Sequence, residues 1–142
     1  MSLTILKGTV VSAPALGRLE VTEGGYLVAE DGVIRGVFSA LPEQYAGAAV
    51  EDHGSDLILQ SFADLHLHAP QYPMRGMGMD LPLLDWLNTY AFPTEARFAD
   101  TDYARAVYRQ LAAELIENGT TRVCMFSSLH TDATLILMEE LE

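Results

Sequence analysis

The segment 64–71, which follows the apolar run 57–59, places two histidines two residues apart at the end of an extended apolar stretch. Residues two apart on a β-strand share a face, so we expect the side chains of His66 and His68 to point the same way. Neutral imidazole is a common ligand of zinc and other borderline divalent ions, and a pair fixed on one strand forms half of a metal site. Two hydrogen-bonded core histidines are the alternative, but the shared face and the Pro- and Gly-rich loop that follows favour a metal.

The residues around this pair predict a strand that is buried on both sides. Phe62 and Asp64 fall in the register of the histidines, whereas Ala63, Leu65 and Leu67 alternate with them. Strands of this kind belong to parallel sheets. We therefore expect both imidazoles at the carboxyl end of a strand in a parallel sheet.

From residue 57 onward the pattern alternates strand, long loop, two helices, strand and helix, which is typical of a parallel α/β architecture. The second helix is expected at 102–117, capped by Asp100 or Thr101, with Gly119 just past its end. The buried stripe of this helix is expected to be Tyr103, Val107, Leu111 and Leu115. The other expected elements are a helix from Asp80 to about Tyr90, a strand at 121–126 and a helical end at 134–142.

Residues 1–56 are expected to form β structure with turns. Strands are predicted at 9–11, 26–29 and 33–38, and the Asp31-Gly32 pair between the last two is a strong hairpin signal. Small and polar residues fill 42–54, which we interpret as a loop leading into the α/β part.

Composition restricts the partners. Eight basic residues against twenty acidic ones give a formal net charge of −12, and Lys7 is the single lysine. No basic patch is expected, so we predict neither a nucleic-acid nor a membrane partner. The single cysteine, Cys124, excludes an intramolecular disulfide, and its apolar neighbours indicate a core thiol in a reducing, cytoplasmic setting. No apolar run approaches transmembrane length.

The segments 57–71, 80–87, 92–98, 118–121 and 130–132 together resemble the amidohydrolase superfamily and, within it, the guanine deaminases. The segment 68–71, His-Ala-Pro-Gln, points to guanine, whereas 81–87 and 93–98 are also similar to triazine chlorohydrolases and related aminohydrolases. The family usually has Pro-Gly where this chain has Gln60-Ser61. That departure concerns the entry of the strand rather than its catalytic end.

The resemblance implies an α/β fold in two parts. Residues 57–142 would form the first β/α units of a metal-dependent amidohydrolase TIM (β/α)₈ barrel, and residues 1–56 the N-terminal part of a small β-sandwich lobe. A complete barrel takes about 250 residues, so the barrel in this chain is expected to be incomplete.

The chemistry implied by the resemblance is zinc-dependent deamination of guanine to xanthine and ammonia. His66 and His68 would be ligands of one divalent ion, Zn²⁺, that activates a water molecule. The family takes its acid–base residues and remaining ligands from later strands, so no catalytic acid or base is expected before Glu142. The protein is expected to be a cytoplasmic homo-oligomer.

The resemblance also implies substrate contacts just after the metal ligands. Gln71 offers a donor and an acceptor to a purine edge, the alternative being a loop glutamine bonded to backbone. Trp86 would close the pocket or anchor its own helix, and His130 would lie in the second shell or make a structural hydrogen bond. The substrate-binding candidates are thus His68, Ala69, Pro70, Gln71 and Trp86.

Two other interpretations remain open from the sequence. One is a related amidohydrolase acting on another heterocycle, such as a triazine chlorohydrolase. The other is a non-catalytic folding or assembly unit, because two histidines without further ligands leave the 142-residue chain inactive by itself.

Overall fold

The computed structural model describes residues 2–142, and the chain divides into two compact units, Met1–Gln60 and Ser61–Glu142. The expected division lay before Leu57. Leu57 and Ile58 instead pair with Thr9 and Val10 of the first unit, so they end its last strand. Among residues 2–142, no helix is long and apolar enough to cross a membrane.

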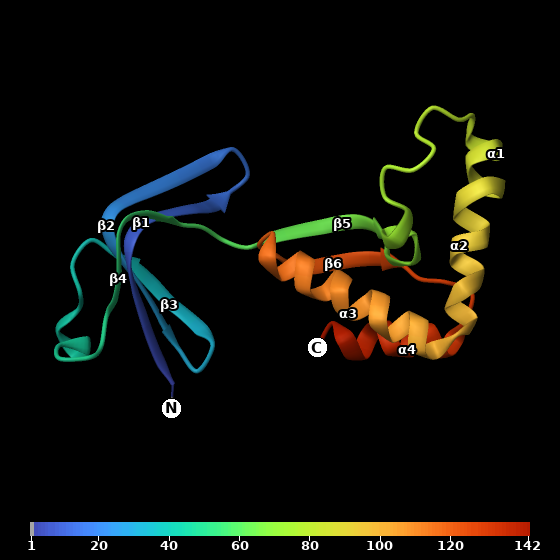
Figure 1. The fold of residues 1–142 in the computed structure, drawn as a ribbon. Helices are drawn as coiled ribbons and strands as arrows, with labels where there is room; N and C mark the ends of the chain where they lie inside the picture. Colours follow the sequence, from blue (N-terminus) through green and yellow to red (C-terminus); the bar gives the residue numbers. More distant parts are fainter. Residues whose placement is uncertain (1) are drawn as a thin grey trace. The chain divides into compact units, whose positions relative to one another are not determined.

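The first unit is a four-stranded sheet with the order β3-β2-β1-β4. Its strands are β1 (Leu3–Ala15), β2 (Arg18–Glu30), β3 (Val33–Phe38) and β4 (Glu51–Ile58). The β1–β2 and β2–β3 pairs are antiparallel, whereas β4 runs parallel to β1 (Figure 1). Asp31 and Gly32 both have positive φ, 48° and 77°, which confirms the predicted tight hairpin between β2 and β3.

The core of this unit forms where one face of the sheet meets the connection to β4. Ile5, Val28 and Tyr45 are buried there, and Tyr45 belongs to the short 3₁₀ helix η1 (Glu43–Tyr45). The expected loop at 42–54 is therefore partly wrong: it contains a helical turn, and β4 already begins at Glu51. Pairing with β1 supplies the regularity that its polar sequence does not signal.

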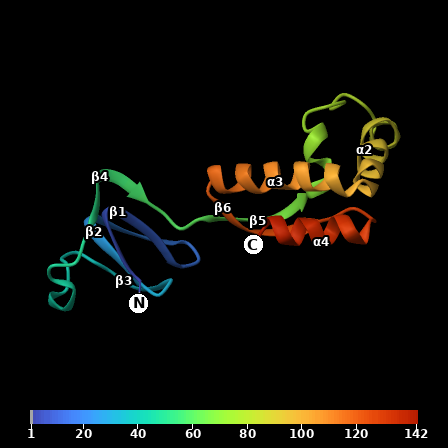
Figure 2. The ribbon, with the colours of Figure 1, turned by 60° about the horizontal axis from the view of Figure 1, so that its bottom comes forward.

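The second unit contains the parallel pair β5 (Phe62–His68) and β6 (Thr120–Phe126), joined by a long helical connection. Helices α3 (Thr101–Glu117) and α4 (Thr131–Glu140) lie side by side next to this pair (Figures 1 and 2). Strands and helices alternate along the chain, which confirms the predicted α/β class. The connection consists of η2 (Ala69–Met74), α1 (Leu83–Trp86), the π-helical turn η3 (Leu87–Ala91), α2 (Phe92–Ala96) and η4 (Arg97–Ala99).

The helix predicted from Asp80 to about Tyr90 does not end there, because α1, η3 and α2 follow one another without a break. Its backbone continues through Pro93, because a π turn precedes the proline and the N–H of Phe92 donates to the carbonyl of Leu87. Pro93 lies at the first turn of α2 but inside this continuous helical run, and the π turn before it accommodates a residue that has no N–H to donate.

Helix α3 follows its sequence signals closely. Asp100, rather than Thr101, is the cap, since its Oδ1 accepts the backbone N–H groups of Asp102 and Tyr103 at 2.9 and 3.2 Å. Gly119 has φ of 76° just past the helix end, as predicted. Of the expected stripe, only Leu111 is fully buried; the other fully buried positions are Ala104 and Tyr108.

The core of the second unit lies between the two helices and one face of the β5–β6 pair. Leu67 and Met125 pack from the strands against it, and its buried members are Ala69, Tyr72, Phe98, Ala104, Tyr108, Leu111, Ala133, Ile136 and Leu137. Cys124 is exposed, which contradicts the predicted core thiol. It alternates with Met125 on β6 and so belongs to the uncovered face.

Candidate metal and substrate site

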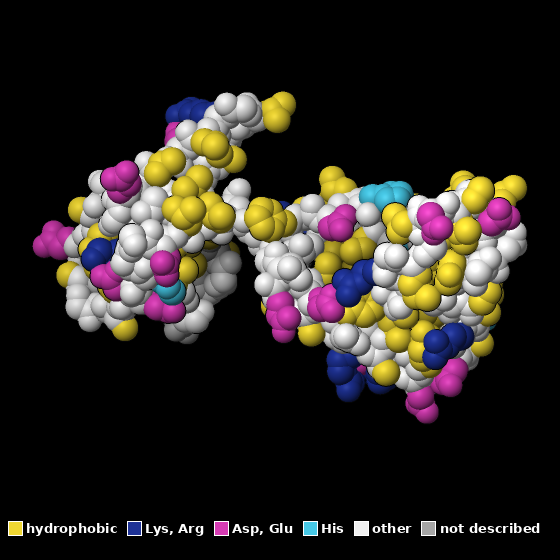
Figure 3. All heavy atoms as spheres, turned by 45° about the horizontal axis from the view of Figure 1, so that its top comes forward, with side chains coloured by type: hydrophobic (Ala, Val, Ile, Leu, Met, Phe, Trp, Pro, Cys, Tyr) yellow, Lys and Arg dark blue, Asp and Glu magenta, His cyan; other side chains and the backbone are white. Residues whose placement is uncertain are grey.

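The two histidines of β5 lie together at the carboxyl end of the strand. The Nε2 atoms of His66 and His68 are 3.3 Å apart, so the predicted convergence of the imidazoles is confirmed. Phe126, at the end of β6, stacks on the His68 ring with centroids 4.6 Å apart and meets the His66 ring edge-on at 5.3 Å. Histidine side chains are visible together at the surface of this unit, beside exposed hydrophobic groups (Figure 3).

A bulge in β5 helps to set this arrangement. Asp64 pairs with Val123 and Leu67 with Met125, so two residues of β5 stand opposite one residue of β6. Asp64 therefore shares a face with Leu67 rather than with the histidines, and the predicted common register of Asp64, His66 and His68 is wrong. The Oδ1 atom of Asp64 accepts the backbone N–H of His66 at 3.0 Å and so holds the bulged segment in place.

The strand is not buried on both sides in this chain. His66 and His68 are exposed, and Leu65 is 77% exposed. Among residues 2–142, β5 pairs only with β6, and the helical core covers one face of this pair. The histidines lie on the open face, where a ligand can reach them.

The spacing of the two imidazoles suits a shared metal ion. Two nitrogens bound to one tetrahedral zinc ion at about 2.0–2.1 Å lie roughly 3.3–3.4 Å apart, which matches the spacing of 3.3 Å between the two Nε2 atoms. Within residues 2–142, no group of three or more His, Cys, Asp or Glu side chains is placed to hold an ion. The pair therefore fits as part of a ligand set whose other members are not among these residues.

A cavity of about 390 Å³ opens beside the histidines. Gln71 and Trp86 line it together with both imidazoles, whereas Ala69 and Pro70 are buried and do not line it. Ala69 opens η2 directly after β5 and packs in the helical core, as does Tyr72 of the same turn. The remaining lining residues come from β5, from the loop and from α3: Leu67, Tyr72, Met74, Arg75, Gly76, Met77, Met79, Leu111, Glu114, Leu115 and Asn118.

Gln71 and Trp86 are both fixed by hydrogen bonds. The Nε2 atom of Gln71 donates to Oε1 of Glu95 at 2.8 Å, so the glutamine is held by a side chain rather than by backbone. The indole N–H of Trp86 donates to the carbonyl oxygen of Met77 at 2.9 Å, which fastens the loop 75–82, where Met77 and Met79 lie, to α1. Trp86 thus forms part of the cavity wall and also anchors the loop.

Glu114 of α3 binds two residues of the segment that follows β5, Tyr72 of η2 and Arg75 just beyond it. Tyr72 donates its hydroxyl to Glu114 at 2.5 Å, and Arg75 donates two hydrogen bonds to the same carboxylate at 2.7 and 3.3 Å. The Arg75 guanidinium also lies over the Tyr72 ring, 4.2 Å from its centroid. The hydrogen bonds from Arg75 and Tyr72 lower the pKa of Glu114, and burial together with the bond to Glu114 raises the pKa of Tyr72.

His130 lies at the start of α4 and does not line the cavity. Its backbone N–H donates to the Ser128 hydroxyl, and its carbonyl accepts the N–H of Thr134. The Nε2 atom is buried, and among residues 2–142 it has no hydrogen-bond partner. The Nε2 atom therefore makes no structural hydrogen bond among residues 2–142, and a second-shell role of His130 stays a prediction.

Three residues of the site did not follow from the sequence: Glu95, Glu114 and Phe126. Glu95 belongs to the 93–98 segment that carries part of the family resemblance, so that motif contained a signal for it. Phe126 and Glu114 had none, because each meets its partner across tens of residues of sequence.

The comparisons with known proteins agree on one family. The sequence model described as "Amidohydrolase family" matches residues 57–142. A guanine deaminase of Rattus norvegicus is 50% identical over 84 residues, which are 59% of this chain and 18% of that protein. A probable guanine deaminase of Schizosaccharomyces pombe is 35% identical over 150 residues, covering 95% of this chain and 28% of that protein.

A solved structure gives the same result for the fold. The guanine deaminase of C. acetobutylicum, determined with guanine bound in its active site, superposes with a TM-score of 0.93 at 42% identity. The match covers 99% of this chain and 33% of that one. The chain thus corresponds to a third or less of the length of these relatives.

Proposed function

The chain belongs to the amidohydrolase family, and from this premise we propose that the protein acts as a metal-dependent guanine deaminase, converting guanine and water to xanthine and ammonia. The observation that carries the proposal is the convergence of His66 and His68 on the wall of a cavity that Gln71 also lines. The likeness to guanine deaminases supports guanine as the substrate.

His66 and His68 would hold the metal ion through their Nε2 atoms, and zinc suits two imidazoles at this spacing. The chemistry that a divalent cation held there would supply is the activation of a water molecule at neutral pH. The stacked Phe126 ring restricts the His68 imidazole, which limits the orientations available to that ligand. We assign the proton-transferring groups and the remaining ligands to residues outside 1–142, since residues 2–142 supply no third ligand.

Gln71 would bind the substrate. It lies three residues beyond His68, lines the same cavity and carries an amide suited to a purine edge. Trp86 would provide an apolar wall for the ring system.

We also propose that the 142-residue chain has no turnover by itself and assembles with other copies. The open face of the β5–β6 pair and the edges of both sheets favour association, with Leu65 and Phe62 being 77% and 60% exposed. Light scattering of the purified chain tests this, and a stable monomer at micromolar concentration would contradict it.

We place this acidic protein in the cytoplasm.

The function is testable in what we call the completed enzyme: residues 1–142 joined to the part of the C. acetobutylicum guanine deaminase that follows the matched region. We expect zinc-dependent release of ammonia from guanine, with xanthine as the product. Triazines are the competing substrates. Faster turnover of a triazine than of guanine would contradict guanine deaminase and favour a related aminohydrolase.

A further inference from the structure

We propose that Glu95 is a positioning residue that makes Gln71 present its carbonyl oxygen, and not its NH₂ group, to the cavity. Gln71 would then accept a hydrogen bond from the ligand and select for a ring or amino N–H at that point. The identity of the ligand rests on the proposed function, whereas the orientation of the amide does not.

The orientation follows from the chemistry of the pair. Gln71 and Glu95 are joined at 2.8 Å through Nε2 and Oε1. An ionised carboxylate only accepts hydrogen bonds, so the group that faces it must be the NH₂ of the amide. The reverse orientation would bring two acceptor oxygens together without a hydrogen between them.

The positions of the two residues leave the amide oxygen of Gln71 for the cavity. Gln71 lines the cavity and Glu95 does not, so Glu95 holds the NH₂ group on the side away from it. Both side chains are half-buried, and Glu95 is carried by α2. Among residues 2–142, no hydrogen bond reaches Oε1 of Gln71, which leaves this acceptor for a ligand.

An acceptor at this point favours one class of ligand. A cyclic amidine that bears ring N–H and amino groups, as guanine does, can donate to Oε1. A heterocycle that presents only unprotonated ring nitrogens or a carbonyl there would face an acceptor with an acceptor, and a mismatched polar contact costs more than a missing one. Glu95 would thus contribute to specificity without touching the substrate.

The orientation can be measured in the 142-residue chain itself. In the ¹⁵N-edited NMR spectrum, we expect one Gln71 side-chain amide proton to be shifted downfield and to exchange slowly with solvent. Glu95→Lys should remove this signature, because an ammonium donates to Oε1 and turns the amide round. Glu117→Gln, which removes an exposed carboxylate at the end of α3, is the matched control and should leave it unchanged. A Gln71 amide that is unaffected by Glu95→Lys would overturn the proposal.

The effect on the ligand is measured by the KM for guanine in the completed enzyme. Loss of one hydrogen bond to the substrate should raise KM about tenfold in Glu95→Lys, with kcat and zinc content close to those of the unchanged enzyme. Glu95→Gln should change KM only about twofold, since a neutral amide still permits the original orientation. If Glu95→Gln and Glu95→Lys raise KM equally, the orientation of the Gln71 amide does not control KM and the proposal is contradicted.

A double-mutant cycle separates positioning from structural damage. If Glu95 acts only through Gln71, then Glu95→Lys should add nothing to the KM of Gln71→Ala. An additional tenfold rise in that background would overturn the proposal. If Gln71→Ala alone leaves KM unchanged, the substrate contact of the proposed function fails, while the NMR result still decides the orientation of the amide.

Discussion

The two faces of the β5–β6 pair show how adjacent residues on one strand acquire different roles. Leu67 and Met125 point into the helical core, whereas His66, His68 and Phe126 lie together on the open face. The covered face holds the unit together, and the open face carries the groups that we propose as metal ligands. Substitutions on the open face should therefore alter chemistry with little cost in stability, and those on the core side should do the reverse.

The largest expected effect is the loss of zinc and turnover on substituting a histidine of the open face. In the completed enzyme, His66→Ala should abolish both zinc binding and turnover, because one imidazole cannot replace the pair. Zinc content is measured by elemental analysis and turnover by ammonia release. The melting temperature of the 142-residue chain should change little, since His66 is exposed. A clear loss of stability in this variant would mean that the open face also supports the fold.

The core side gives the opposite expectation. Tyr108 is fully buried against the core and stacks on Phe98, so Tyr108→Ala should destabilise the 142-residue chain by about 3–5 kcal/mol in urea unfolding. Burial raises the pKa of Tyr108, and its hydroxyl makes no hydrogen bond of ordinary geometry within residues 2–142, although Ser127 and Ser128 lie near enough to lower that pKa in part. Tyr108→Phe is thus the matched control, with an expected change of less than about 1 kcal/mol. A large loss on removing the hydroxyl alone would contradict this description of the core.

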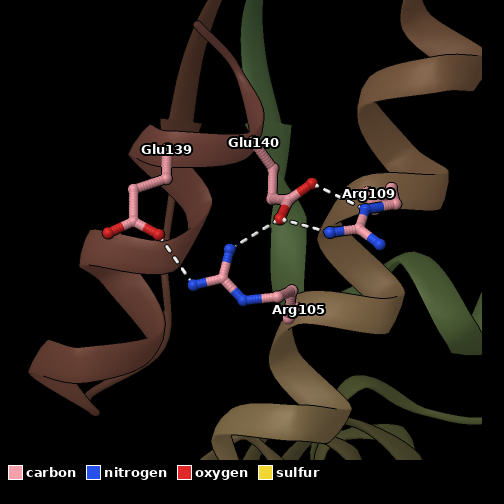
Figure 4. Close-up of polar contacts among 4 residues, drawn as sticks. All are labelled: Arg105, Arg109, Glu139 and Glu140. Carbon is pink, nitrogen blue, oxygen red and sulfur yellow. Dashed lines mark hydrogen bonds and ion pairs between the residues drawn. The ribbon is translucent and has the colours of Figure 1, made fainter.

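A pH-dependent contribution should come from the contact between α3 and α4. Figure 4 shows Glu140 accepting from Arg105 and Arg109, while Arg105 also reaches Glu139. The Glu140 side chain is only 11% exposed, and its bonds from Arg109 and Arg105 lower its pKa below the ordinary 4.5. A carboxylate with a lowered pKa stabilises the fold above its ordinary pKa, and this contribution disappears as the pH falls through the lowered value.

Glu140→Gln should therefore lower the melting temperature by a few degrees at pH 7, and the difference from the unchanged chain should shrink as the pH falls below 4.5. Thermal unfolding followed by circular dichroism at a series of pH values measures this. Glu139→Gln is the control, since its side chain is 60% exposed and pairs with one arginine. A difference that stays constant down to pH 2 would exclude the ionised Glu140 as its cause.

Local signals predicted much of the fold. The strand at 33–38, the Asp31-Gly32 turn and the end of α3 at Gly119 depend on neighbouring residues, and the structure confirms each of them. The cap was left open between Asp100 and Thr101, and the structure selects Asp100. Strict alternation failed at the bulge in β5, because the register there is set by pairing with β6. The exposure of Cys124 was missed for a related reason: an apolar run alone does not tell which face of a strand is covered.

The site was predictable only in part. The histidine pair follows from spacing along one strand, and its convergence is confirmed. Glu95 lies 24 residues from Gln71 and Glu114 lies 42 residues from Tyr72, so both contacts depend on how the helical connection folds back. Periodicity within a segment carries no information about such pairs.

The smallest expected effect concerns the segment after β5 that Glu114 of α3 holds. Glu114 holds Tyr72 and Arg75, but Arg75 is 62% exposed, so solvent screens this ion pair far more than the one at Glu140. Glu114→Gln should leave the melting temperature within about a degree or two and raise the KM for guanine in the completed enzyme about twofold, because the loop that carries Gln71 is held less firmly. Arg75→Gln should give a similar KM, since it breaks the same pair from the other side. Raising the salt concentration should bring the unchanged enzyme closer to both variants. A KM that is insensitive to both substitutions would show that Trp86 and Glu95 hold the loop without help from α3.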